Sequence, residues 1–179
     1  PQDVYVPTST DVEHAKWLGV SWEQDLRETQ EVLGSESFDW LVVDHYGLDR
    51  RWERQMRTRT NRILVIDDLA DREHDCDLLL DQTFGRKALS YASLVPSNCE
   101  MLLGSEYALL RPEFLSLRQK ALEKRANFGQ IQHILVAMGG ADPDNVTQKA
   151  IRGLAKVNWQ TKPSIQVVLG SQAPHWEAV

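Results

Sequence analysis

Proton-handling side chains directly follow an apolar run near residue 40. The run 40–43 is apolar without alternation, and Asp44, His45, Tyr46 and Gly47 come next. Such runs are typical of parallel strands that are covered on both faces. Because ligands of open α/β sheets bind beyond the carboxyl ends of their strands, we predict a catalytic edge at Asp44, His45 and Tyr46.

The same residues also have a purely structural interpretation, in which Gly47 supplies a positive φ in a turn and the two rings only pack. An Asp44–His45 dyad is not expected, because adjacent residues of an extended strand point to opposite faces. The other histidines of the chain carry no motif, and we expect them to be structural or exposed; they are His14, His74, His133 and His175.

A second candidate site lies at Gly139, Gly140 and Asp142, between an apolar run and a predicted helix. Two glycines allow backbone N–H groups to face an anion, and the following helix contributes its positive end, so the position suits a phosphate. The spacing is neither G-x-G-x-x-G nor that of a P-loop. A sharp strand-to-helix turn is therefore the alternative.

Charged residues are concentrated in two neighbouring stretches. Residues 67–81 are rich in acidic side chains, but the spacing matches neither a calcium loop nor a zinc site, and we predict no bound metal. A carboxylate-and-water magnesium site remains the alternative, since it leaves little sequence signature. Residues 50–59 carry several arginines, for which we expect the exposed side of a helix that buries little, with a phosphate-binding patch as the alternative.

Hydrophobic periodicity predicts an α/β protein. Strands are expected at 40–43, 63–66, 76–80, 101–104, 132–138 and 165–169, and helices after Ser21 and Pro112 and over 50–59 and 146–157. The helix after Pro112 is predicted to have a core face of Phe114, Leu115, Leu117 and Leu122. We place a domain boundary between residues 125 and 126.

Composition limits the class of protein. The 179 residues carry 26 acidic and 20 basic side chains, a net charge of -6, which disfavours nucleic acid as a partner. No apolar run approaches the ~20 residues that span a bilayer, so no membrane partner is expected. With only two cysteines in the chain, we expect a reducing cytoplasm rather than a secreted disulfide scaffold.

Five motifs in this order resemble the PseG-type UDP-sugar hydrolases of pseudaminic acid biosynthesis. They are Leu41-Val42-Val43-Asp44-His45-Tyr46-Gly47, Ile66-Asp67-Asp68, His74-Asp75-Cys76-Asp77, the segment 104–114 and Met138-Gly139-Gly140-Ala141-Asp142. The resemblance implies two Rossmann-like domains of the GT-B type, as in the MurG-type glycosyltransferases, each incomplete in this chain. Residues 1–125 then form the later part of the first domain with a linker helix, and residues 126–179 begin the nucleotide-binding domain.

The resemblance also implies an activity. Family members hydrolyse UDP-2,4-diacetamido-2,4,6-trideoxy-β-L-altropyranose by water attack at the anomeric carbon, without a cofactor, and the sugar continues to the pseudaminic acid of flagellin and surface polysaccharide. Tyr46, with Asp44 and His45, then lies on the catalytic wall, and Tyr46 orients the water or the sugar. Gly139, Gly140 and Asp142 fall on the substrate-binding side that holds UDP.

The family's G-x-G-H-x-x-R motif, which carries the expected catalytic base, does not occur in this sequence. We therefore expect the base to lie upstream of Pro1 and this 179-residue chain alone to be inactive. Three other functions remain open, namely a MurG-like UDP-sugar glycosyltransferase, a non-catalytic UDP-sugar binding module and a metal-dependent phosphohydrolase. The sequence predicts no oligomeric state.

Overall fold

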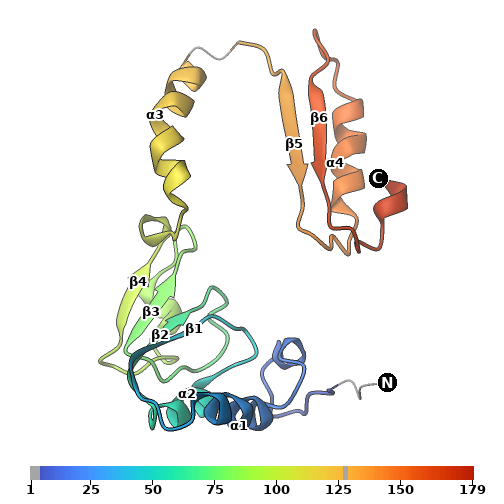
Figure 1. Ribbon diagram of the computed structural model, residues 1–179. Coiled ribbons are helices and arrows are strands. Elements are labelled where there is room, and N and C mark those ends of the chain that lie inside the picture. The colour runs from blue at the N-terminus through green and yellow to red at the C-terminus, as the bar shows by residue number, and fades with distance from the viewer. Residues whose placement is uncertain (1–4, 127–128) are drawn as a thin grey trace. The chain divides into compact units, whose positions relative to one another are not determined.

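A computed structural model describes residues 5–126 and 129–179 of the chain (Figure 1). The chain forms two compact units; the first ends at Leu110 and the second begins at Arg111. The boundary predicted between residues 125 and 126 lies at the end of a helix of the second unit and stays a prediction. No helix among the described residues has the length and apolar content needed to cross a membrane.

The first unit is built on a parallel sheet of four strands, in the order β1 (Phe38–Val43), β2 (Thr60–Ile66), β3 (Leu78–Asp81) and β4 (Glu100–Leu103). Val43 is opposite Val65, which in turn is opposite Leu79, and all three side chains are buried. Because the strands are parallel, their carboxyl ends share one edge of the sheet. The predicted α/β class with a parallel sheet, consistent with a Rossmann-like fold, is confirmed, whereas the GT-B arrangement stays a prediction.

Two helices of the first unit, α1 (Trp22–Leu33) and α2 (Arg50–Met56), pack against each other. The Ser21 side chain accepts a hydrogen bond from the Gln24 amide and thereby caps α1, as the sequence predicted. The prediction that the 50–59 helix buries little is wrong, because α2 buries Trp52, Glu53 and Met56.

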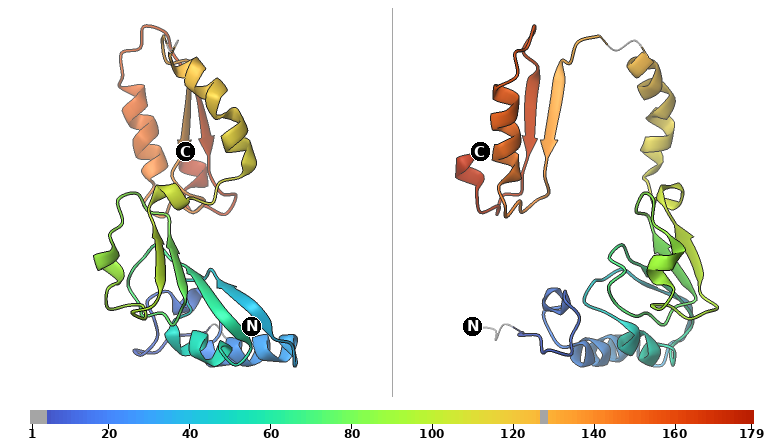
Figure 2. Two further views of the ribbon diagram at one scale, coloured as in Figure 1. Left: turned by 90° about the vertical axis from the view of Figure 1, so that its left-hand side faces the viewer. Right: turned by 180° about the vertical axis from the view of Figure 1, so that it is seen from behind.

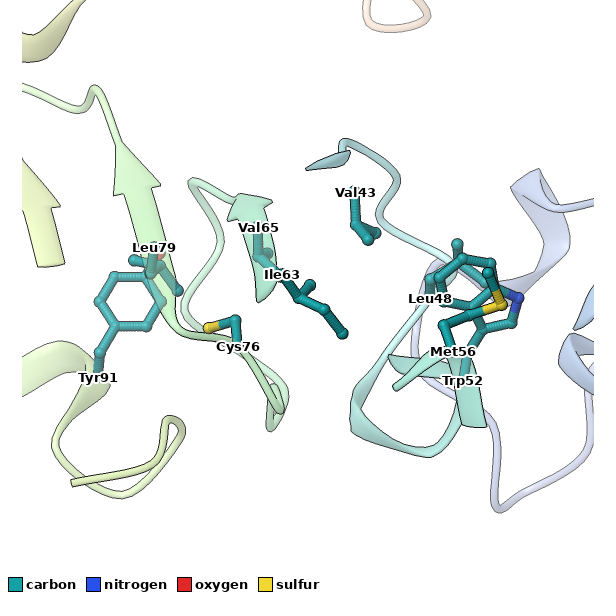
Figure 3. Packing of buried hydrophobic residues seen from close by; sticks show 9 residues of the cluster. All are labelled: Val43, Leu48, Trp52, Met56, Ile63, Val65, Cys76, Leu79 and Tyr91. Carbon is teal, nitrogen blue, oxygen red and sulfur yellow. The ribbon is translucent and has the colours of Figure 1, made fainter. Parts of the chain in front are cut away.

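The core of the first unit extends from α2, beneath the strands, to the short helix η2 (Ala88–Tyr91) (Figure 3). Its buried members are Val43, Leu48, Trp52, Met56, Ile63, Val65, Cys76, Leu79 and Tyr91. The expectation that the apolar run before Asp44 is covered on both faces is wrong in this structure. Trp40 and Val42 remain 44% and 56% exposed, because only one face of β1 meets the core of the described residues.

The second unit contains α3 (Pro112–Ala126), a parallel pair of strands, β5 (His133–Ala137) and β6 (Ser164–Val168), and α4 (Val146–Ala155), which runs alongside the strands (Figure 2). Ile134 is opposite Ile165, and Val136 is opposite Val167. The core face predicted for the helix after Pro112 is not observed, since α3 buries none of its residues in the described structure. The apolar side chains of α3 are therefore exposed; they are Phe114, Leu115, Leu117 and Leu122.

Candidate functional site

A polar cleft of about 410 Å³ opens at the carboxyl edge of the four-stranded sheet. The strands β1, β2 and β3 each contribute the residues that follow or end them, so the cleft occupies the position expected for a ligand in a parallel sheet. It is lined by Asp44, Tyr46, Ile66, Asp67, Asp68, Gln82 and Thr83. Two of the three predicted catalytic residues, Asp44 and Tyr46, thus line one cleft.

The Tyr46 hydroxyl is the best-positioned reactive group in this cleft. It donates a hydrogen bond of 2.6 Å to Oδ1 of Asp68. That hydrogen bond, partial burial and the negative charges of Asp68, Asp67 and Asp44 raise the pKa of Tyr46 to about 12. The phenol therefore keeps its proton at neutral pH and acts as a hydrogen-bond donor rather than as a base.

Three side chains surround the Tyr46 ring. The ring centroids of His14 and Trp17 lie 5.8 and 5.6 Å from that of Tyr46, and the Arg72 guanidinium carbon lies 5.8 Å from it. Arg72 is itself held by the carbonyl oxygen of Leu48 at 2.8 Å. The aromatic ring is thus fixed on several sides, which sets the direction of its hydroxyl.

The third predicted catalytic residue, His45, is not among the residues that line the cleft, and its catalytic role stays a prediction. Its Nδ1 accepts a hydrogen bond of 3.0 Å from the Gly47 amide, so the neutral ring carries its proton on Nε2. A side chain at Gly47 would approach the His45 ring to 3.0 Å and the His14 carbonyl oxygen to 3.3 Å. The expectation of a positive φ at Gly47 is wrong, because φ is positive at other glycines and not there. An alanine at this position would require its neighbours, chiefly the His45 ring, to shift by a few tenths of an ångström.

The neighbouring carboxylates Asp67 and Asp68 have different surroundings. Asp67 is buried; its Oδ1 binds Arg72 at 2.7 Å, and its Oδ2 accepts the Ala70 amide and lies 2.9 Å from the Tyr91 hydroxyl. Burial opposes ionisation, but the Ala70 amide and the Arg72 charge outweigh it, and the pKa of Asp67 lies below its usual value. Asp68 is exposed and is the carboxylate of the pair available to a ligand.

A buried polar network supports the cleft from behind. The Tyr91 hydroxyl lies 2.9 Å from Asp67 and 2.8 Å from Asp81, and Asp81 also pairs with Arg86. Burial and the nearby carboxylates raise the pKa of Tyr91. Arg72, Tyr91 and Arg86 belong to no sequence motif and were therefore not predicted as site residues. Asp81 could have been predicted from the sequence, because it directly follows the apolar run 78–80.

Part of the acidic stretch 67–81 pairs with arginines of residues 50–59. Arg57 binds both Asp75 and Asp77, at 3.2 and 2.7 Å. The charges of these three residues compensate one another, so Arg57 is not a free cation for a phosphate, and Asp75 and Asp77 are not free carboxylates for a magnesium ion. Further pairs within hydrogen-bond distance are Arg50–Glu73, Arg51–Asp49 and Arg54–Asp75.

One group of side chains among the described residues has potential metal ligands close together. The ligand atoms of Glu13, His14 and Asp71 lie within 4.8 Å of one another. Glu13 and Asp71 are exposed, and Asp71 already accepts a hydrogen bond from Arg72 at 3.0 Å. Such an exposed acidic group is common in proteins that bind no metal, so it does not establish a metal centre.

In the second unit, Asp142 caps helix α4. Its two carboxylate oxygens accept the amides of Val146 and Thr147, each at 2.8 Å. Hydrogen bonds from Thr147 and Val146 hold the pKa of Asp142 below its usual value. The carboxylate therefore occupies the position at the helix N-terminus where an anion would bind, and a phosphate must use other N–H groups.

The glycines of the second candidate site bring two strand ends together. Gly139 has a φ of +87°, in the left-handed region that favours glycine. The Gly170 amide donates to the Gly140 carbonyl at 2.9 Å, and a Cβ on Gly170 would lie 2.4 Å from that oxygen. The loops after β5 and β6 can approach this closely only because residue 170 lacks a side chain.

Comparisons with known proteins support the resemblance seen in the sequence. The chain is 33% identical over 134 residues to the UDP-2,4-diacetamido-2,4,6-trideoxy-beta-L-altropyranose hydrolase of Campylobacter jejuni, covering 74% of this chain and 46% of that protein. It is 25% identical over 149 residues to the spore coat polysaccharide biosynthesis protein SpsG of Bacillus subtilis, covering 82% of this chain and 42% of SpsG. No family model matches the chain.

The chain thus spans less than half the length of the relatives that it matches. The hydrolase and SpsG are similar to it over most of its own length, and they are named for a UDP-sugar and for polysaccharide biosynthesis. The predicted relationship is therefore confirmed: this chain is a relative of the PseG-type UDP-sugar hydrolases.

Proposed function

We propose that the natural protein carrying this chain hydrolyses UDP-2,4-diacetamido-2,4,6-trideoxy-β-L-altropyranose to UDP and the free sugar, in the biosynthesis of a surface polysaccharide. The observation that carries this proposal is the Tyr46–Asp68 pair, 2.6 Å apart, in a polar cleft at the strand ends of a chain related to such a hydrolase.

The charge of the cleft indicates which part of the substrate it binds. Asp44 and Asp68 are exposed carboxylates on its wall, and such a wall repels the diphosphate of UDP. It suits a water molecule and the hydroxyl and amide groups of a sugar, which donate hydrogen bonds to carboxylates. We therefore assign this cleft to the sugar and the attacking water.

The reaction requires one bond to form and one to break at the anomeric carbon. The water oxygen bonds to that carbon, the bond from the carbon to the phosphate oxygen breaks, and UDP leaves with the bonding electrons. Positive charge develops on the sugar ring in the transition state. Asp44 and Asp68 stabilise that charge, and the protonated Tyr46 hydroxyl positions the sugar or the water. The water's proton passes to a general base, whose assignment stays a prediction.

The diphosphate is assigned to the loop after β5 in the second unit. Gly139 and Gly140 leave room for a ligand to approach the backbone, since a Cβ on either residue would meet no atom within 4 Å. Asp142 stabilises the loop through its cap on α4 rather than by contacting the phosphate. This gives Asp142 a different role from the one predicted by sequence resemblance, while its place in the substrate-binding loop stays a proposal.

The test is UDP release from the UDP-sugar by the purified natural protein, with and without an organic acceptor. Tyr46→Phe should lower kcat about 100-fold, the lower end of the range for loss of one hydrogen-bonding group in an active site. The matched control is Tyr107→Phe, an exposed tyrosine of the same unit outside the cleft lining, which should keep wild-type turnover.

Each other outcome has a defined meaning. Unchanged turnover in Tyr46→Phe would remove this residue from the mechanism. UDP release that depends on an acceptor would indicate a glycosyltransferase, and tight UDP-sugar binding without release would indicate a binding module. Loss of activity in EDTA would indicate a metal-dependent reaction.

A further inference from the structure

Trp17 presents a large apolar side chain to solvent next to the candidate site. Its exposed fraction is 56%, whereas Trp52 in the core is 5% exposed. Exposed tryptophans also occur elsewhere in the chain, so exposure alone assigns no role. What distinguishes Trp17 is its contact with Tyr46, whose ring centroid is 5.6 Å away.

The position of Trp17 is fixed by its own short helix. Trp17 ends η1 (Ala15–Trp17), and its amide donates to the His14 carbonyl at 2.9 Å. Ala15 anchors the helix because its side chain is buried. The His14 ring packs edge-on against the indole, with 4.6 Å between centroids. The indole is therefore held in place before any ligand binds, which lowers the entropic cost of using it as a contact.

Few of the side chains that line the cleft are apolar. Ile66 is the single aliphatic residue among its lining side chains, and the others are polar or acidic apart from the Tyr46 ring. Sugar sites commonly need both kinds of surface, since hydrogen-bonding groups orient the ligand and aromatic or aliphatic groups cover its C–H faces. Trp17 does not line the cleft itself, but it contacts the ring of Tyr46, which does.

We propose that Trp17 is a specificity-determining residue, whose indole packs against the apolar part of the sugar while Tyr46 and Asp68 bind its polar groups. This inference rests on the proposed function. A 2,4-diacetamido-2,4,6-trideoxy sugar has a methyl group at C6 and two acetamido methyl groups, so it offers more apolar surface than an ordinary hexose. Trp17 selects the deoxy sugar over a hexose that carries a hydroxyl at C6.

The experiment compares Trp17→Ala and Trp17→Phe with the wild type in the natural protein. The dissociation constant of the intact UDP-sugar is measured by calorimetry, and KM and kcat are measured where turnover occurs. Trp17→Ala should raise the dissociation constant and KM about tenfold, as loss of one aromatic contact does, with a smaller change in kcat. Trp17→Phe should restore most of the binding. The dissociation constant of UDP alone should not change.

The control is Trp40→Ala, an exposed tryptophan on β1 that contacts Arg62 and should leave both constants unchanged. Thermal unfolding of every variant shows whether it folds, and Trp17→Phe keeps the test valid if Trp17→Ala does not. Unchanged UDP-sugar binding in a folded Trp17→Ala variant would overturn the inference. A parallel loss of UDP binding would also overturn it, because the indole would then contact the uracil.

Failure of the proposed function gives a different result. In that case the wild type releases no UDP, whereas the calorimetric comparison still shows whether Trp17 contributes to sugar binding. The preference for the deoxy sugar over UDP-N-acetylglucosamine should fall in Trp17→Ala. An unchanged preference would contradict the assigned selectivity.

Discussion

The loops at the strand ends of the two units hold their acidic residues in different ways. In the first unit, Asp67 is buried and is bound by the nearby Ala70 amide and Arg72 and also by the Tyr91 hydroxyl, 24 positions away along the chain. Arg72 in turn binds the Leu48 carbonyl, which is also 24 positions away from it. In the second unit, Asp142 binds the amides of residues 146 and 147, only a few positions away. One loop is fixed by tertiary contacts and the other by a local cap.

This difference determines how each candidate site depends on the rest of the molecule. The cleft beside Tyr46 keeps its shape only while a buried set of charges stays compensated, and such a set is sensitive to the loss of any member. The loop at Gly139 needs a helix cap, which nearby residues supply, and the close backbone approach of Gly140 and Gly170. The predictions below test this contrast.

The largest effect is expected for Arg72→Leu. Removing the guanidinium leaves the buried Asp67 carboxylate without its charged partner, which should destabilise the first unit by about 3–5 kcal/mol. Urea unfolding followed by tryptophan fluorescence measures the change. The control is Arg54→Leu, whose guanidinium is 62% exposed in its pair with Asp75 and should cost about 1 kcal/mol or less. Equal effects of the two substitutions would contradict the tertiary origin of the first loop's stability.

A smaller effect is expected for Gly170→Ala in the second unit. The new Cβ would lie 2.4 Å from the Gly140 carbonyl oxygen, so the two loops must separate, at a cost of about 1–3 kcal/mol. Gly153→Ala is the matched control, because Gly153 lies within α4 with no atom near its added Cβ, and alanine there should stabilise the helix by about 0.5–1 kcal/mol. Urea unfolding followed by circular dichroism should show opposite signs for the two variants.

The smallest effect is expected in the pH dependence of the α4 cap. The pKa of Asp142 is lowered in the folded state, so its ionised carboxylate stabilises the folded protein. This stabilisation is fully present above the unfolded pKa of about 3.9 and is lost as pH falls through the folded pKa. Asp142→Asn should remove this dependence while leaving a capping oxygen in place. Hydrogen exchange of the Val146 and Thr147 amides between pH 2 and 6 measures it. Identical pH profiles in the two proteins would show that the carboxylate charge contributes nothing.

The sequence predicted the order and type of the elements well, because apolar periodicity and turn residues are local properties. The strand at 63–66 and the cap at Ser21 are examples that the structure contains. The predictions that Trp40 and the apolar side of α3 are buried were both wrong, and for the same reason. A pattern shows that a face is apolar, but it does not show which part of the chain packs on it.

Residues of the candidate site could be predicted only where reactive side chains directly follow an apolar strand pattern. Tyr46 and Asp44 were found in this way, and the structure brings them together with Asp68. The residues that fix Tyr46, namely His14, Trp17 and Arg72, were not predicted, because their contacts join positions far apart in the sequence. Single residues without a motif acquire a role only when the fold is known.

The Tyr91 hydroxyl has fewer hydrogens to donate than it has acceptors beside it. The group has one hydrogen, yet two carboxylate oxygens lie within 2.9 Å of it, one from Asp67 and one from Asp81. It therefore donates to one acceptor at a time, and the other carboxylate relies on its arginine, Arg72 or Arg86. The proton can change partner by rotation of a single O–H bond. The layer behind the cleft thus has two nearly equivalent hydrogen-bonding states for one arrangement of heavy atoms.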